Sequence, residues 1–66
     1  MSKDPKEIVQ EMVQLVGKRR AERLLVAEKV STSVAGKLVR GKYESEIGDF
    51  IADAIAKARV AATRAS

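Results

Sequence analysis

The chain has neither cysteine nor histidine among its 66 residues, and this absence limits most strongly what it can fold into. Domains of this size often rely on disulfides or a bound metal, because a short chain buries only a modest apolar core. Disulfides, Cys/His zinc sites and catalysis by cysteine or histidine are all excluded by the composition. The fold therefore depends on the packing of apolar side chains, with self-association as the remaining reinforcement.

Apolar residues recur at helical spacing along the first half of the chain. Asp4 is a favourable N-cap and Pro5 a favourable first helical residue, so a first helix is expected to begin there. Gly17 is expected to end this helix. A second helix is expected over about residues 18–29.

Two further helices are expected in the second half of the chain. Ser31 is the expected N-cap of a third helix that begins at residue 31 or 32 and ends at Arg40, before Gly41. Ser45 is expected to cap a long fourth helix that reaches about residue 63. Its buried side is expected to consist of Ile47, Phe50, Ile51, Ala54, Ile55, Ala58 and Ala62. No segment alternates as a β-strand does, so the sequence predicts a single all-α domain over residues 1–66 with four helices.

The balance of charge favours an anionic partner. Thirteen Lys and Arg residues stand against nine Asp and Glu residues, which gives a net charge of +4. Four cations crowd the first turns of the second helix, namely Lys18, Arg19, Arg20 and Arg23. The helix dipole disfavours cations at that end, so their presence there points to a functional role.

The third helix combines the features that a DNA-reading helix requires. Val34 and Leu38 are expected to face inward and hold the helix on the domain. Small, hydroxyl and cationic residues are expected on the other side, where they can approach base edges and phosphates. These candidate DNA-binding residues are Thr32, Ser33, Gly36, Lys37 and Arg40.

The stretch from Val30 to Gly41, VSTSVAGKLVRG, resembles the turn and recognition helix of phage repressor and Cro-like helix-turn-helix proteins. The resemblance implies that the third helix enters the major groove and that the second helix lies across the DNA backbone. Two positions depart from the family pattern. Leu25 stands where an alanine is usual, and Lys29 stands where a glycine is usual. Lys29 is therefore expected to be left-handed or to form a differently shaped turn.

Other residues are expected to support binding. Sequence-independent attraction to phosphates is assigned to Arg19, Arg20, Arg23 and Lys42. Tyr43 is expected either to donate a hydrogen bond to a phosphate or to cover the edge of the core. Small residues at heptad spacing in the fourth helix predict a homodimer contact. The residues assigned to this interface are Ala54, Ala58, Ala61, Ala62 and Ala65.

Together these features predict a homodimeric, sequence-specific, double-stranded DNA-binding transcriptional regulator of phage, plasmid or bacterial type. One alternative is a small adaptor or inhibitor that binds a protein through the exposed face of the fourth helix. Another is a non-specific architectural or RNA-binding protein, which would show steep salt dependence without a preferred sequence.

Catalysis, cofactors and small-molecule ligands are not expected. Two acidic pairs are four residues apart, Asp49 with Asp53 and Glu7 with Glu11, but no nucleophile or glycine-rich phosphate loop accompanies them. No apolar run is long enough to span a membrane, and the first residues do not resemble a signal peptide. A cytoplasmic location is therefore expected.

Overall fold

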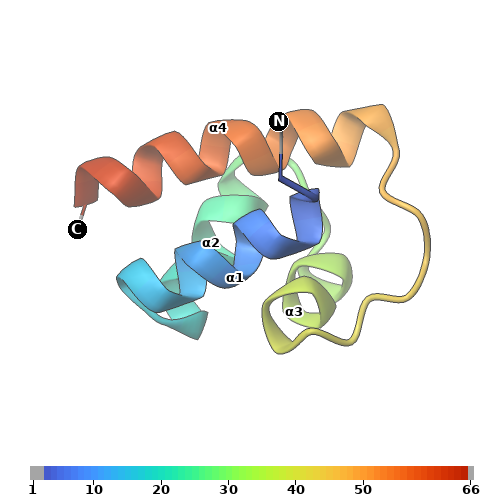
Figure 1. Ribbon diagram of the computed structural model, residues 1–66, viewed down its shortest axis with the longest axis horizontal. Helices are drawn as coiled ribbons and strands as arrows, with labels where there is room; N and C mark the ends of the chain where they lie inside the picture. The colour runs from blue at the N-terminus through green and yellow to red at the C-terminus, as the bar shows by residue number, and fades with distance from the viewer. Residues whose placement is uncertain (1–2, 66) are drawn as a thin grey trace.

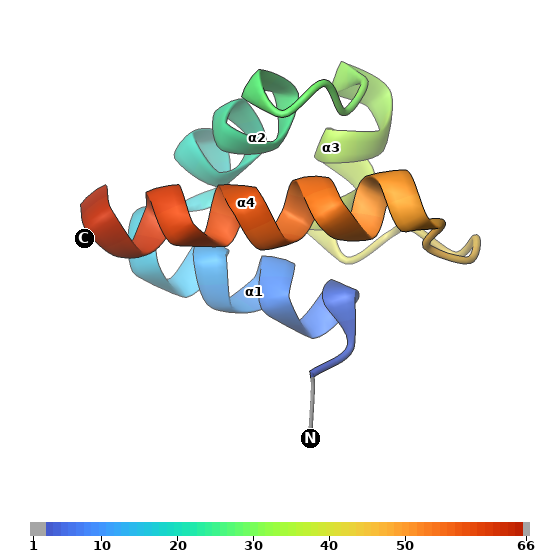
Figure 2. The same cartoon turned by 90° about the horizontal axis from the view of Figure 1, so that it is seen from above.

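The computed structural model describes residues 3–65, which form four α-helices. These are α1 (Pro5–Val16), α2 (Lys18–Ala27), α3 (Thr32–Arg40) and α4 (Asp49–Ala65). Within this range there is no strand. The long helix α4 lies against α1 and α2, whereas α3 packs against α2 and α1 on another side of the domain (Figure 1). Figure 2 shows α4 crossing in front of the other three helices. The prediction of a four-helix all-α fold with a long C-terminal helix is confirmed.

The ends of α1 follow from its local sequence. The Asp4 side chain accepts a hydrogen bond of 2.8 Å from the backbone N–H of Lys6, as an N-cap does, and Pro5 occupies the first turn. Gly17 has a φ of 89°, which a residue with a side chain rarely adopts, and its N–H donates to the Val13 carbonyl. Because Gly17 alone separates the two helices, α2 turns away from α1 without a longer loop.

The turn between α2 and α3 is closed by a Schellman motif. The N–H of Val30 donates to the carbonyl of Leu25, and the N–H of Lys29 donates to the carbonyl of Val26. Lys29 has a φ of 74°, so of the two conformations expected for it the left-handed one is found. Val30 and Leu25 are both buried in the core, which supplies the apolar contact that accompanies this motif. α2 ends at Ala27, two residues earlier than expected.

Helix α4 begins later than the sequence indicated. It starts at Asp49, after an irregular segment over residues 42–48, and Ser45 is an exposed bend in that segment rather than an N-cap. The first turn is closed by the N–H of Ala52, which donates to the carbonyl of Gly48. A helix from Ser45 would place Gly48 in its first turn, and glycine is a poor helix former. The irregular segment instead lets Tyr43 and Ile47 pack against the edge of the core.

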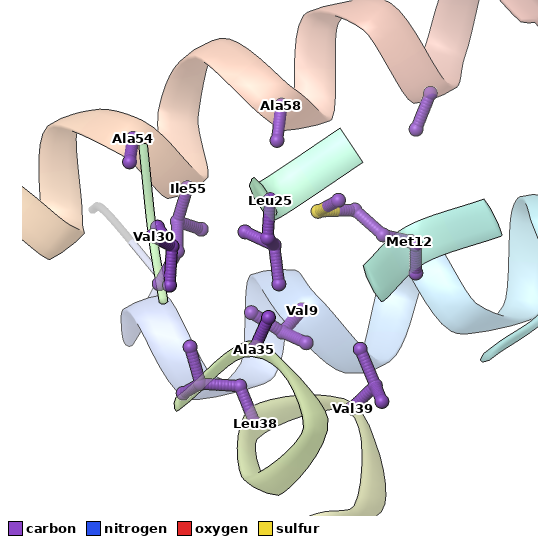
Figure 3. Close-up of a cluster of buried hydrophobic side chains, with 12 residues drawn as sticks. Val9, Met12, Leu25, Val30, Ala35, Leu38, Val39, Ala54, Ile55 and Ala58 are labelled. Carbon is purple, nitrogen blue, oxygen red and sulfur yellow. The ribbon is translucent and has the colours of Figure 1, made fainter. Parts of the chain in front are cut away.

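The core is formed entirely by apolar side chains. Figure 3 shows them converging from all four helices and from the turn before α3. Val9, Met12, Leu25 and Ile55 are the largest fully buried side chains. The complete set is Val9, Met12, Ala21, Leu25, Val30, Ala35, Leu38, Val39, Ala54, Ile55, Ala58 and Ala62. No polar or charged side chain is buried among the described residues, so no desolvation cost offsets this packing.

Phe50 was expected in the core, and that expectation is wrong. The buried stripe of α4 is centred near Ile55, Ala58 and Ala62, and Phe50 lies about 90° from its centre at about 100° per residue. Its side chain is 62% exposed. Ile47 and Ile51, also assigned to the buried side, are only partly buried at its edge.

The predicted dimer interface is also wrong for its central residues. Ala54, Ala58 and Ala62 are buried in the core of the same chain, where they face α1 and α2. Ala61 is partly buried, and Ala65 is exposed. The alanine repeat therefore serves close packing within one chain, because alanine lets α4 approach its neighbours without a large side chain between them.

The left-handed residue in the α2–α3 turn leads to a stability prediction. Replacing Lys29 by glycine should raise the free energy of unfolding by about 0.5–1 kcal/mol, because glycine adopts a positive φ without a steric penalty. Chemical denaturation followed by circular dichroism measures the change. Lys42→Gly is the matched control, since Lys42 has no positive φ, and it should give no gain. A loss of stability in Lys29→Gly would contradict this account of the turn.

Candidate functional site

Positive charge is concentrated on the helix pair α2–α3. These two helices contain six Lys or Arg residues and one acidic residue, Glu22. The whole chain has a net charge of only +4, so the rest of the molecule is close to neutral. Within residues 3–65, none of the six cations takes part in an ion pair. Their charge is therefore available to an external anion.

Helix α3 presents one side to the core and the other to solvent. Ala35, Leu38 and Val39 are buried, and Val34 is partly buried at the edge. Val39 was not identified from the sequence, and it moves the centre of the inward side away from Val34. The exposed residues of α3 are Thr32, Ser33, Lys37 and Arg40. The structure thus brings Ser33, Lys37 and Arg40 together on one open side, as the sequence predicted.

The ends of α3 are both well capped. The Ser31 side chain accepts a hydrogen bond of 3.2 Å from the N–H of Val34. At the other end Gly41 is left-handed with a φ of 71°, and the N–H of Lys42 donates to the Lys37 carbonyl. The Gln10 amide from α1 adds a hydrogen bond of 3.1 Å to the Leu38 carbonyl. These contacts fix the helix on the domain, so its outer side is presented in one orientation.

Gly36 was expected on the open side of α3, and that expectation is wrong. It is buried, and the position that a Cβ would occupy lies 3.0 Å from Nη1 of Arg40. The three atoms nearest to that position all belong to the Arg40 guanidinium. The Arg40 guanidinium therefore folds back over the glycine, one turn earlier in the same helix. A ligand reaches the backbone at Gly36 only after this side chain rotates away.

An open hollow of about 440 Å³ lies between α2 and the start of α3. Its lining consists of Arg19, Glu22, Arg23, Val26 and Thr32. The hollow brings two of the predicted cations next to a hydroxyl of the third helix, whereas Arg20 is exposed but does not line it. Glu22 and Val26 were not identified from the sequence as part of this site. Helical spacing could have identified them, because residues 19, 22, 23 and 26 share one side of a helix.

Lys42 and Tyr43, which follow α3, lie in different environments. Lys42 is exposed, but Tyr43 is partly buried against the core and its ring carries the Lys6 ammonium at 5.8 Å from the centroid. Tyr43 also borders a small hollow with Gln10, Leu38 and Gly41. Of the two roles expected for Tyr43, covering the core edge is the one that its packing supports.

The site contains hydrogen-bond donors and cations and little that could do covalent chemistry. Among the described residues, no three acidic side chains are grouped to hold a metal ion. No helix in residues 3–65 has both the length and the hydropathy to span a bilayer. Arg and Lys side chains next to hydroxyl groups are suited to recognising phosphates and the acceptor atoms of bases.

Comparison of the chain with family models, with curated proteins and with solved structures gave no match. The helix-turn-helix resemblance is therefore neither supported nor contradicted by relatives.

The contact between Gly36 and Arg40 leads to a second prediction. Gly36→Ala should raise the free energy of unfolding by about 1 kcal/mol, because alanine favours the helix and the flexible Arg40 side chain can move aside. Thermal or chemical denaturation of Gly36→Ala, Arg40→Ala and the double variant measures this as a double-mutant cycle. If the double variant gains more free energy of unfolding than the two single variants together, the excess is the cost of displacing Arg40. Net destabilisation by Gly36→Ala would show that the site is more rigid than described.

Proposed function

We propose that this protein binds double-stranded DNA in a sequence-specific manner and regulates transcription, with α3 as the recognition helix in the major groove. The observation that carries the proposal is the outer side of α3, where Ser33, Lys37 and Arg40 are exposed and the two cations form no ion pair with any residue from 3 to 65. A buried apolar side and caps at both ends hold this helix rigidly. An α-helix of this kind fits the major groove with its outer side toward the base edges.

The residues of α3 divide into two roles in this proposal. Arg40 and Lys37 can donate to the O6 and N7 acceptors of guanine, and Arg40 can do so in bidentate fashion. Thr32 and Ser33 lie in the first turn, where short hydroxyl side chains approach bases or phosphates closely. Arg40 lies against its own helix in the free protein, so its engagement with a base requires a side-chain rotation and no change of fold.

Helix α2 is suited to contact the phosphate backbone. Gly17 offers no side-chain cap to α2, and no acidic residue lies in the first turn, where Lys18, Arg19 and Arg20 stand instead. Free backbone N–H groups and cations together attract a phosphate. Arg19 and Arg23 line the neighbouring hollow together with Glu22, and we place the phosphate contact at these two arginines, because Glu22 repels phosphates.

Selection from random duplex DNA, followed by binding titrations on the selected duplex, tests the proposal. Arg40→Ala should weaken binding to the selected site by about 1–3 kcal/mol and relax the preference for it. Arg19→Ala should weaken binding to every duplex about equally and reduce the salt dependence, because its contact is with phosphate. Arg59→Ala, which removes an exposed arginine from α4, is the matched control and should leave specific binding unchanged.

Two outcomes would contradict the proposal. If selection yields no preferred sequence and Arg40→Ala has the same small effect on every duplex, binding is non-specific. If no duplex binds at low salt, the basic surface of α2 and α3 serves another anionic partner.

A further inference from the structure

We propose that the outer side of α4 is a self-complementary surface that pairs in antiparallel fashion with the same surface of a second copy of this chain. This surface is separate from the proposed DNA-binding surface. It lies on the exposed side of α4, whereas the central alanines of the interface expected from the sequence are buried.

A stripe of exposed residues follows the outer side of α4 at spacings of three, four, three and four. Its members are Phe50, Asp53, Lys57, Val60 and Arg64. This is the repeat of the contact positions in a coiled coil. Phe50 and Val60 are 62% and 51% exposed, and they are the two most exposed large apolar side chains among the described residues. The helix thus carries an a/d-type seam that its own domain leaves uncovered.

The seam is symmetric in its chemistry about one point of the helix. Phe50 and Val60 are ten residues apart, and Asp53 and Lys57 are four residues apart, so both pairs are centred on residue 55. A two-fold axis at that level sets Phe50 of each copy opposite Val60 of the other. The same axis sets Asp53 opposite Lys57. Because an isologous interface needs such internal complementarity, the register argues for a second copy rather than an unrelated partner.

Each layer of this arrangement pairs matching groups. The phenyl ring of Phe50 enters the hole formed on the second copy by Lys57, Val60, Ala61 and Arg64, at i, i+3, i+4 and i+7. Ala61 leaves room for the ring, and the Arg64 guanidinium can lie over its face as a cation–π contact. The two layers in which Phe50 faces Val60 lie at the outside of the interface. The two layers in which Asp53 faces Lys57 lie between them.

The central charges are already paired within one chain. Lys57 Nζ lies 3.1 Å from an Asp53 carboxylate oxygen, and both side chains are more than 60% exposed. Asp53 raises the pKa of Lys57 by accepting its hydrogen bond and by Coulombic attraction, with a smaller contribution from Glu28. In the antiparallel pair the two Asp53–Lys57 pairs meet and form a network of four alternating charges, without an unpaired charge at the centre of the interface.

The seam leaves the proposed DNA surface free. Helix α4 packs against α1 and α2, and α3 lies on another side of the domain (Figure 2). Pairing through the outer side of α4 therefore covers neither Lys37 nor Arg40. Failure of self-association would leave the DNA-binding proposal intact, and failure of DNA binding would leave this one intact.

Sedimentation equilibrium between about 10 µM and 1 mM measures the association, a range suited to an interface this small. The wild-type chain should dimerise, and Val60→Glu should raise the dissociation constant at least about ten-fold. Asp53→Lys should have a similar effect, since it faces Lys57 of the second copy with a like charge. The combined swap Asp53→Lys with Lys57→Asp should return the constant to within about three-fold of wild type.

The control for these variants is Leu15→Glu, which places a charge on an exposed leucine of α1, away from the seam. It should leave the association unchanged. Far-ultraviolet circular dichroism shows whether each variant is folded, and all the altered residues are exposed. A monomer throughout the range, equal association of Val60→Glu and wild type, or loss of association in Leu15→Glu would overturn the proposal.

Cross-linking tests the register directly, because the chain has no cysteine of its own. An equal mixture of Phe50→Cys and Val60→Cys chains should form a disulfide-linked dimer under mild oxidation, since each cysteine faces the other across the two-fold axis. Neither variant alone should do so efficiently. Efficient linking of either variant alone would indicate a parallel pairing, and no linking in the mixture would contradict the register; either result overturns the proposal.

Discussion

Close packing of α4 onto α1 and α2 is the interaction on which the rest of the structure depends. The chain has no disulfide and no Cys/His metal site, so its stability comes from a small apolar core. Ala54, Ala58 and Ala62 let the longest helix approach its neighbours, and Ile55 fills the centre with Met12 and Leu25. Each large side chain buried in this way contributes roughly 1.5–3 kcal/mol. Helix α4 thus completes a core in which α1, α2 and α3 also contact one another directly.

Local signals predicted most of the fold, because helix ends depend on short-range chemistry. Asp4, Ser31 and the left-handed Gly41 act as the sequence indicated, since each satisfies backbone groups within a few residues of itself. The start of α4 was missed for the opposite reason. Ser45 had the side chain of an N-cap, but the chain stays irregular up to residue 48, and Ile47 packs on a core that forms from distant segments. Tertiary packing decided between two locally acceptable starts.

The side of α4 that is buried could not be deduced from periodicity alone. Two stripes run along this helix at heptad spacing, one of alanines and one through Phe50 and Val60. The alanine stripe was assigned to a partner because small residues at heptad spacing suit close helix pairing, yet the helices that they approach are α1 and α2 of the same chain. For α3 the prediction of the exposed side succeeded, because Lys37 and Arg40 are costly to bury and Leu38 is not. The covering of Gly36 by Arg40 depends on a rotamer, which the sequence does not encode visibly.

The distribution of charge separates the two surfaces that the molecule leaves open. On α2 and α3 the cations greatly outnumber the single acidic residue and have no ion-pair partners among the described residues, so this surface repels a second copy of itself. On the outer side of α4, acidic and basic residues alternate between two exposed apolar ones, and Lys57 is already paired with Asp53. A field of one sign attracts a polyanion over a long range, whereas a balanced seam is attractive only in one register and at contact. The basic side of the domain is therefore suited to DNA, and the balanced side is suited to another molecule of the same protein.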